Sequence, residues 1–177
     1  LGEHCSGDKR SLYEESLRVP MLVRCPRLFG KGRTVDGMVL NVDLAPTFLD
    51  LAGVPVPKTM QGVSWKPLAA GESPASWRQP FFAEYYRELG DVPTCYALRT
   101  TSHKLVKYPN LPGWTEVFDL NADPWEMKNL AGDSALMARL DAELAVQMKL
   151  AGYTPPADAN KPKAGEQDKA AADRKEP

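Results

Sequence analysis

The chain has 177 residues, with 22 Lys and Arg against 23 Asp and Glu and a net charge of −1. This length is enough for one domain with a real hydrophobic core and is short for two. The balanced charge gives no electrostatic basis for binding nucleic acid or an anionic membrane, so neither is expected as a partner. Cys5, Cys25 and Cys95 are odd in number and widely spaced, which fits neither a disulfide framework nor a zinc site.

The first half of the chain predicts one strand, one helix and a connector. RVPMLVRCP, residues 18–26, holds a short apolar block between prolines, which is typical of a strand buried in an α/β sheet. VLNVDLAPTFLDLAGVP predicts a helix that Asp43 caps and Gly53 ends. One face of this helix is expected to carry Leu44, Phe48 and Leu51. Prolines interrupt residues 54–80, which are expected to form an irregular connector.

The second half predicts strands followed by a helix. PFFAEYY, CYALRTTSHKLVKYP and TEVFDL alternate or pair as in hairpins, with His103 in a hairpin tip, and favour an antiparallel sheet. SALMARLDAELAVQMKLAG predicts the strongest helix, with Ser134 as its cap and Gly152 at its end. Its apolar face, which a sheet is expected to cover, contains residues that recur at helical spacing: Leu136, Met137, Leu140, Leu144, Met148 and Ala151. After Tyr153 no hydrophobic residue is larger than alanine, so residues 154–177 are expected to be a disordered tail.

Five phrases, in this order, resemble the C-terminal portion of a type I, formylglycine-dependent sulfatase of the alkaline-phosphatase superfamily. They are LGEHCSGDKRSLYEESLRVPMLVRCP, LNVDLAPTFLDLAGVPVP, MQGVSWKPL, YALRTTSHKLVKY and VFDLNADPWEMKNLA, which together cover about residues 1–150. The resemblance implies an α/β fold: the end of a large parallel or mixed sheet, then a small antiparallel sheet packed by a C-terminal helix. It implies a remnant of the catalytic domain in residues 1–80, a small subdomain in residues 81–153 and the tail in residues 154–177.

The resemblance also implies a site. Lys9 matches the family's lysine that contacts an oxygen of the sulfate group, and is therefore the candidate catalytic and substrate-binding residue. A fixed ammonium beside oxygens that gain negative charge stabilises the transition state. His4 is a candidate substrate-binding residue, which can donate a hydrogen bond or a proton to the leaving alcohol, or else a structural loop histidine. The family's Ca²⁺ ligands and formylglycine nucleophile are expected upstream of Leu1, so no metal ligand is expected in this chain.

Other residues of chemical interest have structural interpretations. Glu14 and Glu15 are adjacent on a short helix, where they do not face each other, and are expected to support the helix start, with Arg18 available as a partner. Asp119 and Asp123 do not complete the D-x-[DN]-x-[DN]-G calcium loop and are expected to form turns.

Residues 95–99 partly match the nucleophile motif of sulfatases. Cys95 begins C-x-A-x-R, but the serine of the sulfatase nucleophile motif is absent, and a small apolar residue entering a strand is the expected role. The main hypothesis is a sulfatase that hydrolyses sulfate esters of a small molecule or glycan and is exported, as the family suggests. The alternatives are a phosphonate or phosphate ester hydrolase and a non-catalytic interaction module. By itself the chain is expected to lack sulfatase activity and to aggregate or stay loosely packed.

Overall fold

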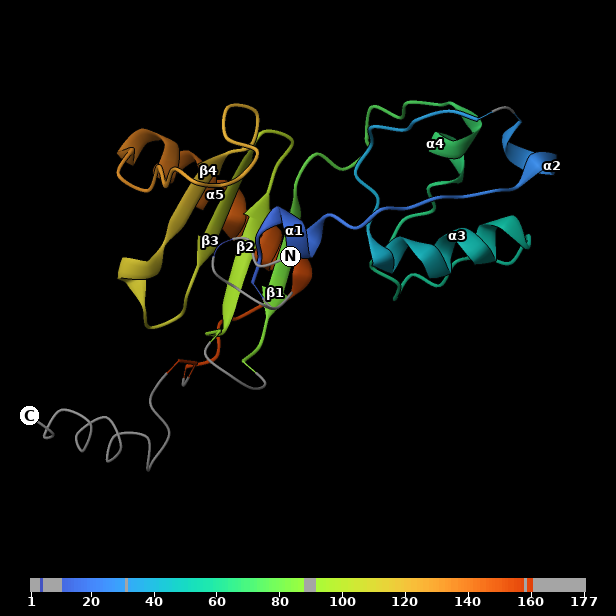
Figure 1. Cartoon of the computed structure of the whole chain (residues 1–177). Helices are drawn as coiled ribbons and strands as arrows, with labels where there is room; N and C mark the ends of the chain where they lie inside the picture. Colours follow the sequence, from blue (N-terminus) through green and yellow to red (C-terminus); the bar gives the residue numbers. More distant parts are fainter. Residues whose placement is uncertain (1–3, 5–10, 31, 88–91, 158, 161–177) are drawn as a thin grey trace, which may run out of the picture. The chain divides into compact units, whose positions relative to one another are not determined.

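The computed structural model describes residues 4, 11–30, 32–87, 92–157 and 159–160 (Figure 1). The chain forms two compact units: Pro20–Pro80 is one, and Leu1–Val19 joins Phe81–Pro177 in the other. Residues from both ends of the sequence thus build one unit, in which the first residues belong with the small sheet rather than with residues 20–80. Over the described ranges, no helix combines the length and the apolar character needed to cross a membrane.

The discontinuous unit is built on a four-stranded antiparallel sheet. Its strands are β1 (Phe81–Tyr85), β2 (Cys95–Arg99), β3 (His103–Lys107) and β4 (Glu116–Asp119), in the order β1-β2-β3-β4. Leu98 pairs with Phe82 on one side and with Leu105 on the other, and Leu105 pairs with Val117. The predicted antiparallel sheet and its central hairpin are confirmed.

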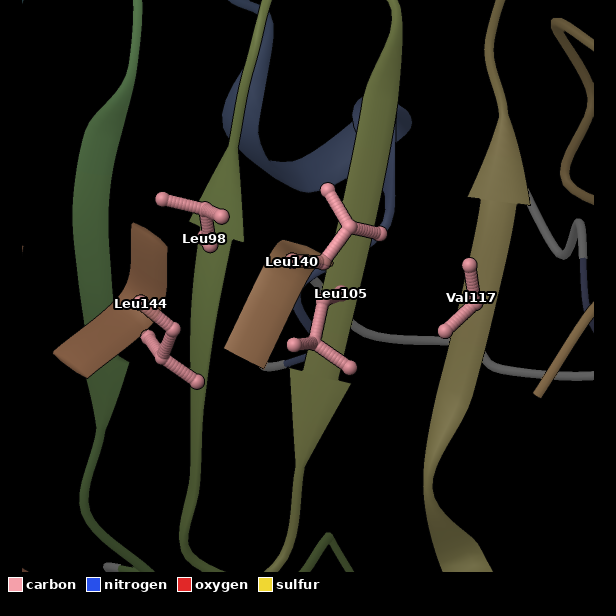
Figure 2. Close-up of a cluster of buried hydrophobic side chains, with 5 residues drawn as sticks. All are labelled: Leu98, Leu105, Val117, Leu140 and Leu144. Atoms are coloured by element: carbon pink, nitrogen blue, oxygen red, sulfur yellow. The ribbon is translucent and has the colours of Figure 1, made fainter. Parts of the chain in front are cut away.

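One face of the sheet packs against helix α5 (Ser134–Ala151). The shared core contains Leu98, Leu105 and Val117 from three strands, with Leu140 and Leu144 from the helix, all of them buried (Figure 2). Burying a leucine side chain of this kind contributes about 1.5–3 kcal/mol to stability. The helical spacing of leucines in the sequence therefore predicted the helix face that covers the sheet.

The opposite face of the sheet is covered by the N-terminal segment. Leu12 packs with Cys95, Ala97 and Val106, and Leu17 of helix α1 (Glu14–Leu17) adds to this cluster. Because strand residues alternate between the two faces, Ala97 and Val106 meet the N-terminal segment while their neighbours Leu98 and Leu105 meet α5. The middle strands are consequently buried on both sides, and residues 11–17 are held on the sheet.

The ends of α5 agree to within one residue with those predicted from the sequence. Asp133, not Ser134, is the N-cap, and its Oδ1 accepts hydrogen bonds from the backbone N–H groups of Ala135 at 3.1 Å and Leu136 at 3.0 Å. Either residue type can cap a helix, and here the carboxylate one position earlier reaches the free N–H groups. Gly152 ends the helix as predicted, with a φ of 65° that glycine adopts without strain.

The Pro20–Pro80 unit contains α2 (Pro26–Phe29), the 3-10 turn η2 (Asn41–Asp43), α3 (Leu44–Leu51) and α4 (Lys66–Ala70). The predicted helix is α3, but its buried residues are Pro46 and Thr47, whereas Phe48 is 62% exposed, so the predicted apolar face is wrong at Phe48. The reason is polar: the Thr47 hydroxyl donates to the Asp43 carbonyl at 2.7 Å and accepts from the Trp65 N–H at 3.1 Å. Thr47 thus links α3 to Trp65 through a buried hydrogen bond.

Asp43 organises the unit instead of capping α3. Its carboxylate is fully buried and accepts from the backbone N–H groups of Leu40 and Val63, each at 2.8 Å, and it forms an ion pair with Arg78. A buried carboxylate needs such partners to offset its lost hydration. Next to it the chain is tight: a Cβ on Gly62 would lie 2.0 Å from the Val42 carbonyl oxygen, which only glycine avoids.

The strand predicted from RVPMLVRCP is absent from the structure. Its apolar side chains are exposed: Leu22 at 98%, Val19 at 58% and Met21 at 44%. A buried parallel strand needs a neighbour on each side, and the described residues form a single sheet, to which this segment does not belong. The apolar residues of this segment favour burial, but none of the described parts of the chain covers them.

Part of the segment predicted to be a disordered tail, residues 154–177, makes specific hydrogen bonds. The Asn160 side chain accepts from the Thr94 N–H at 2.7 Å and donates to the Thr94 carbonyl at 2.9 Å, and Asn110 donates to the Ala159 carbonyl at 2.6 Å. Composition missed this because asparagine amides bind backbone groups without burying apolar area. Residues 161–177 lie outside the described residues, and the expected disorder there stays a prediction.

Candidate functional site

The two candidate site residues have different outcomes. Lys9 lies outside the described residues. His4 is described and has a backbone φ of 55°, and its ring stacks on the Tyr13 ring with centroids 3.8 Å apart and planes 3° apart. Its Nε2 lies 3.8 Å from Glu15 Oε2, and its side chain is 12% exposed. The histidine is thus held in one orientation by the start of α1.

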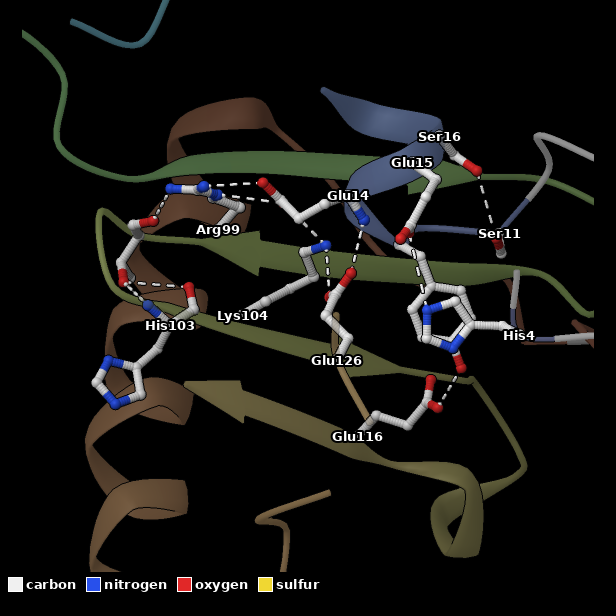
Figure 3. A network of polar contacts seen from close by, with 12 residues as sticks. His4, Ser11, Glu14, Glu15, Ser16, Arg99, His103, Lys104, Glu116 and Glu126 are labelled. Carbon is white, nitrogen blue, oxygen red and sulfur yellow. Dashed lines mark hydrogen bonds and ion pairs between the residues drawn. The ribbon is translucent and has the colours of Figure 1, made fainter. Parts of the chain in front are cut away.

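Glu14 anchors this region to the sheet through two cations (Figure 3). Its carboxylate lies 2.9 Å from Arg99 Nη2 and 2.9 Å from Lys104 Nζ, which come from β2 and β3. Lys104 is fully buried and also lies 2.7 Å from Glu126 Oε1, while Glu126 Oε2 accepts the Glu14 N–H at 2.6 Å. We call Glu14, Arg99, Lys104 and Glu126 the charged network.

The two carboxyl groups of the charged network have opposite pKa shifts. Burial works to raise the pKa of Glu14, but hydrogen bonds from Arg99 and Lys104 and their positive charges outweigh it, and the pKa is lowered. Burial is also the largest influence on Glu126, and there it prevails over the charge of Lys104, so the pKa is raised. The two cations thus favour the ionised form of Glu14, whereas the charge of Lys104 offsets only part of the rise that burial causes in the pKa of Glu126.

A second set of contacts ties Tyr13 to the sheet. Its hydroxyl donates to Glu116 Oε1 at 2.7 Å, and the Tyr108 hydroxyl donates to Glu116 Oε2 at 2.8 Å. Burial and the Glu116 carboxylate raise the pKa of both tyrosines well above the ordinary value, so both hydroxyls remain protonated donors. Tyr13 thereby connects His4, on its ring, to β4, through its hydroxyl.

One set of described residues has the spacing of a metal site. Candidate ligand atoms of His4, Glu15 and Glu126 all lie within 4.8 Å of one another. However, Glu126 already binds the Lys104 ammonium and the Glu14 N–H, and Ca²⁺ prefers six to eight oxygen ligands to an imidazole. These residues do not fit calcium, and their arrangement is better explained as an ion-pair network.

The structural interpretations of Cys95, Asp119 and Asp123 are confirmed, whereas His103, predicted to lie in the hairpin tip, is the first residue of β3. Cys95 is fully buried at the start of β2, and burial, then the Glu116 charge, raises the pKa of its thiol to about 12, which suits no nucleophile. Asp119 accepts from the Asn121 N–H at 3.0 Å and Asp123 from the Lys128 N–H at 2.7 Å, as turn residues do. His103 begins β3, and its Nδ1 lies 2.8 Å from Ser102 Oγ.

Sequence reasoning missed the partners of Glu14. It offered Arg18, whereas the structure pairs Glu14 with Arg99 and Lys104, more than eighty positions away. One signal was present: two-residue alternation in HKLVK places Lys104 on the same face as Val106, which is an inward face. Nothing local in the sequence indicated that Glu126, in a turn with a φ of 53°, would meet that lysine.

The fold is that of the C-terminal part of a sulfatase. Residues 2–152 match the family described as N-sulphoglucosamine sulphohydrolase, C-terminal, and the chain belongs to this family. The resemblance to sulfatases and the α/β fold expected from it are confirmed. As a class, the sulfatase relatives point to a metal cofactor.

Curated relatives include two N-acetylglucosamine sulfatases. The N-acetylglucosamine-6-O-sulfatase of Bacteroides thetaiotaomicron is 43% identical over 136 residues, which cover 75% of this chain and 24% of the relative. The human N-acetylglucosamine-6-sulfatase is 32% identical over 180 aligned positions, covering 83% of this chain and 32% of the relative. The chain therefore spans about a quarter to a third of the length of these relatives.

Solved structures are also similar to this chain. BT4656 in complex with its substrate D-glucosamine-2-N,6-O-disulfate superposes with a TM-score of 0.82 and 36% identity, covering 89% of this chain and 33% of that one. A phosphonate monoester hydrolase from Silicibacter pomeroyi matches less well, with a TM-score of 0.50 and 31% identity over 63% of this chain.

Proposed function

We propose that this chain is the C-terminal part of a sulfatase that hydrolyses a sulfate ester on an amino sugar. The observation that supports it best is the combined match in sequence and structure to a sulfatase bound to a sulfated glucosamine, at 36% identity and a TM-score of 0.82. In this proposal the nucleophile, expected to be formylglycine, and the metal, expected to be Ca²⁺, come from the part of the sulfatase fold that this chain does not cover.

The proposed contributions of this chain are a cation and an oriented imidazole. The Lys9 ammonium contacts a sulfate oxygen and stabilises negative charge there as the ester bond to sulfur breaks. His4, held by Tyr13 and Glu15, faces the substrate and donates a hydrogen bond or a proton to the leaving alcohol oxygen. The charged network supports both roles by fixing α1, the helix that follows Lys9, on the sheet.

The proposal also explains the exposed apolar segment. Val19, Met21 and Leu22 have the composition of a buried parallel strand but find no neighbour in the described residues. In a complete sulfatase fold, strands from the rest of the enzyme would lie beside this segment and cover it. For the same reason the isolated chain is proposed to be inactive.

The experiment is a comparison of Lys9→Ala with wild type in the full-length enzyme that this proposal implies. Glucosamine-6-O-sulfate is the substrate, and Lys128→Ala, which changes an exposed lysine in a turn, is the matched control. Removing one preorganised donor to the developing charge is expected to lower kcat/KM by about 10²–10³. A fall of less than threefold, or an equal fall in the Lys128 variant, would remove Lys9 from the site.

The second candidate function is phosphonate ester hydrolysis, which the likeness to the phosphonate monoester hydrolase favours. Both chemistries place a cation beside peripheral oxygens, so Lys9 does not distinguish them. The same enzyme preparation should therefore be assayed with an aryl sulfate and an aryl phosphonate monoester. A higher kcat/KM for the phosphonate would replace the sulfatase proposal with this one.

A further inference from the structure

An open pocket of about 420 Å³ lies beside Tyr13 at the start of β4. Its lining includes three aromatic side chains, a carboxylate and an amide: Tyr13, Tyr108, Trp114, Glu116 and Asn129. None of the roles proposed above uses Trp114 or this space. All the lining residues belong to the same compact unit, so the pocket is built within it.

Trp114 gives the pocket an aromatic surface. It lies in the 3-10 turn η3 (Pro112–Trp114), where its ring meets Tyr108 edge-on, with centroids 5.8 Å apart and planes at 64°. The contact holds the indole in place, while 55% of the residue remains exposed. The face of an aromatic ring is negative and attracts weakly positive C–H groups, such as those on one face of a sugar ring. An exposed but fixed tryptophan in a polar pocket suits such a ligand.

Glu116 determines the polarity and charge of the pocket. Each of its two oxygens accepts one tyrosine hydroxyl, from Tyr13 at 2.7 Å and from Tyr108 at 2.8 Å. An ionised carboxylate offers about four acceptor positions, so about two remain for a ligand that brings O–H or N–H donors. A ligand bearing its own sulfate or carboxylate would be repelled by the same charge. The pocket chemistry thus favours a neutral ligand rich in hydroxyl groups.

The pocket adjoins the candidate site through Tyr13. The ring of this residue stacks on His4 at 3.8 Å, and its hydroxyl binds Glu116 in the pocket. A ligand in the pocket would therefore lie one aromatic ring away from the histidine proposed to contact the sulfated sugar. A glycan chain that places its sulfated residue at His4 can place an adjoining residue here.

We infer that this pocket binds a neutral sugar residue next to the sulfated amino sugar, with Trp114 contacting its C–H face and Glu116 accepting its hydroxyl groups. The inference rests on the proposed function and adds a preference: the enzyme should favour a sulfated sugar linked to an uncharged neighbour. A sulfated or uronic acid neighbour should be a poorer substrate because of Glu116.

The test compares Trp114→Ala with wild type in the full-length enzyme on two substrates. One is glucosamine-6-O-sulfate, and the other is the same sugar linked to a neutral hexose. We expect the variant to lower kcat/KM for the disaccharide roughly tenfold, mainly through KM, and to change the monosaccharide value by less than about twofold. Trp125→Ala is the matched control, because Trp125 is 66% exposed and does not line the pocket. Trp114→Phe should restore most of the loss.

Equal effects of Trp114→Ala on both substrates, or no effect on either, would overturn the inference. Glu116→Gln gives a second readout: it should narrow the preference for a neutral over a uronic acid neighbour, and an unchanged preference would refute the role of Glu116. If the wild-type enzyme cleaves no sulfate ester, the proposed function fails, and the pocket is judged by NMR titration with the neutral disaccharide. A shifted Trp114 indole N–H then supports the pocket, and an unshifted one overturns it.

Discussion

Lys104→Met is the sharpest test of the charged network. Lys104 is fully buried in β3 and lies 2.9 Å from Glu14 and 2.7 Å from Glu126, whose side chain is also fully buried. The methionine fills nearly the same volume, so the change removes the charge with little loss of packing. Glu14 keeps Arg99, but Glu126 keeps only the Glu14 N–H among the contacts described above. Removing the Lys104 charge therefore affects mainly Glu126.

The expected magnitude follows from this geometry. Removing one partner of a buried ion pair costs about 3–5 kcal/mol, because the other charge stays buried without compensation. With a urea m-value of about 2 kcal/mol/M, a loss of about 4 kcal/mol lowers the unfolding midpoint by about 2 M. Lys104→Met combined with Glu126→Gln should recover much of this loss, because no unpaired buried carboxylate remains.

The assay is urea unfolding of the full-length enzyme that the proposal implies, followed by circular dichroism. Lys107→Met is the control, since Lys107 is 28% exposed and pairs with Asp141 at the surface, and we expect it to cost less than about 1 kcal/mol. The pKa of Glu126 is already raised, and it rises further without Lys104, so the variant gains stability relative to wild type as the pH falls from 7 toward 4.5. A midpoint shift no larger than that of the control, or a gap that stays constant with pH, would refute the reasoning.

Two further predictions concern the sheet and its helix. Cys95 should resist iodoacetamide at pH 8 until the chain unfolds, as mass spectrometry of a variant with Cys5→Ser and Cys25→Ser would show; rapid labelling of the folded chain would contradict its burial. Because the pKa of this thiol is raised to about 12, its contribution to stability should be complete below about pH 9 and lost as the pH rises toward 12. Asp133→Ala should lower the free energy of unfolding by about 1 kcal/mol through the lost cap, whereas Ser134→Ala should cost less; the reverse order would restore Ser134 as the cap.

Sequence patterns predicted the elements of the fold that depend on residues close together in the sequence. Alternation identified the β2–β3 hairpin, and helical spacing identified α5 with the leucines that it buries. These elements obey two periodicities that a sequence displays directly. Gly152 was predicted from a different local rule: glycine adopts without strain the positive φ with which this helix ends.

Long-range partners were beyond the reach of sequence patterns. Asp43 looked like the cap of α3, yet its carboxylate pairs with Arg78 and accepts from the backbone N–H groups of Val63, 20 positions away, and of Leu40, 3 positions before it. Glu14 looked like a helix-start acid, and its partners come from β2 and β3. The packing of the sheet determines which cation pairs with which carboxylate. The spacing of residues along the chain does not indicate these pairs. The resemblance to sulfatases identified His4, but its stacking on Tyr13 required the structure.

The sheet unit is built from two separate stretches of the sequence, which affects both its folding and its response to proteolysis. Glu14 and Arg99 are 85 positions apart, Tyr13 and Glu116 are 103 apart, and Glu14 and Glu126 are 112 apart. The hairpins of the sheet close from nearby residues, whereas the segment that carries His4 must wait until more than a hundred further residues have been joined. Contacts of such long sequence separation form slowly. Conversely, a protease that cuts within Pro20–Pro80 after these contacts have formed should leave two peptides that remain associated, because the contacts of Tyr13 and Glu14 with the sheet unit do not depend on the backbone between residues 20 and 80.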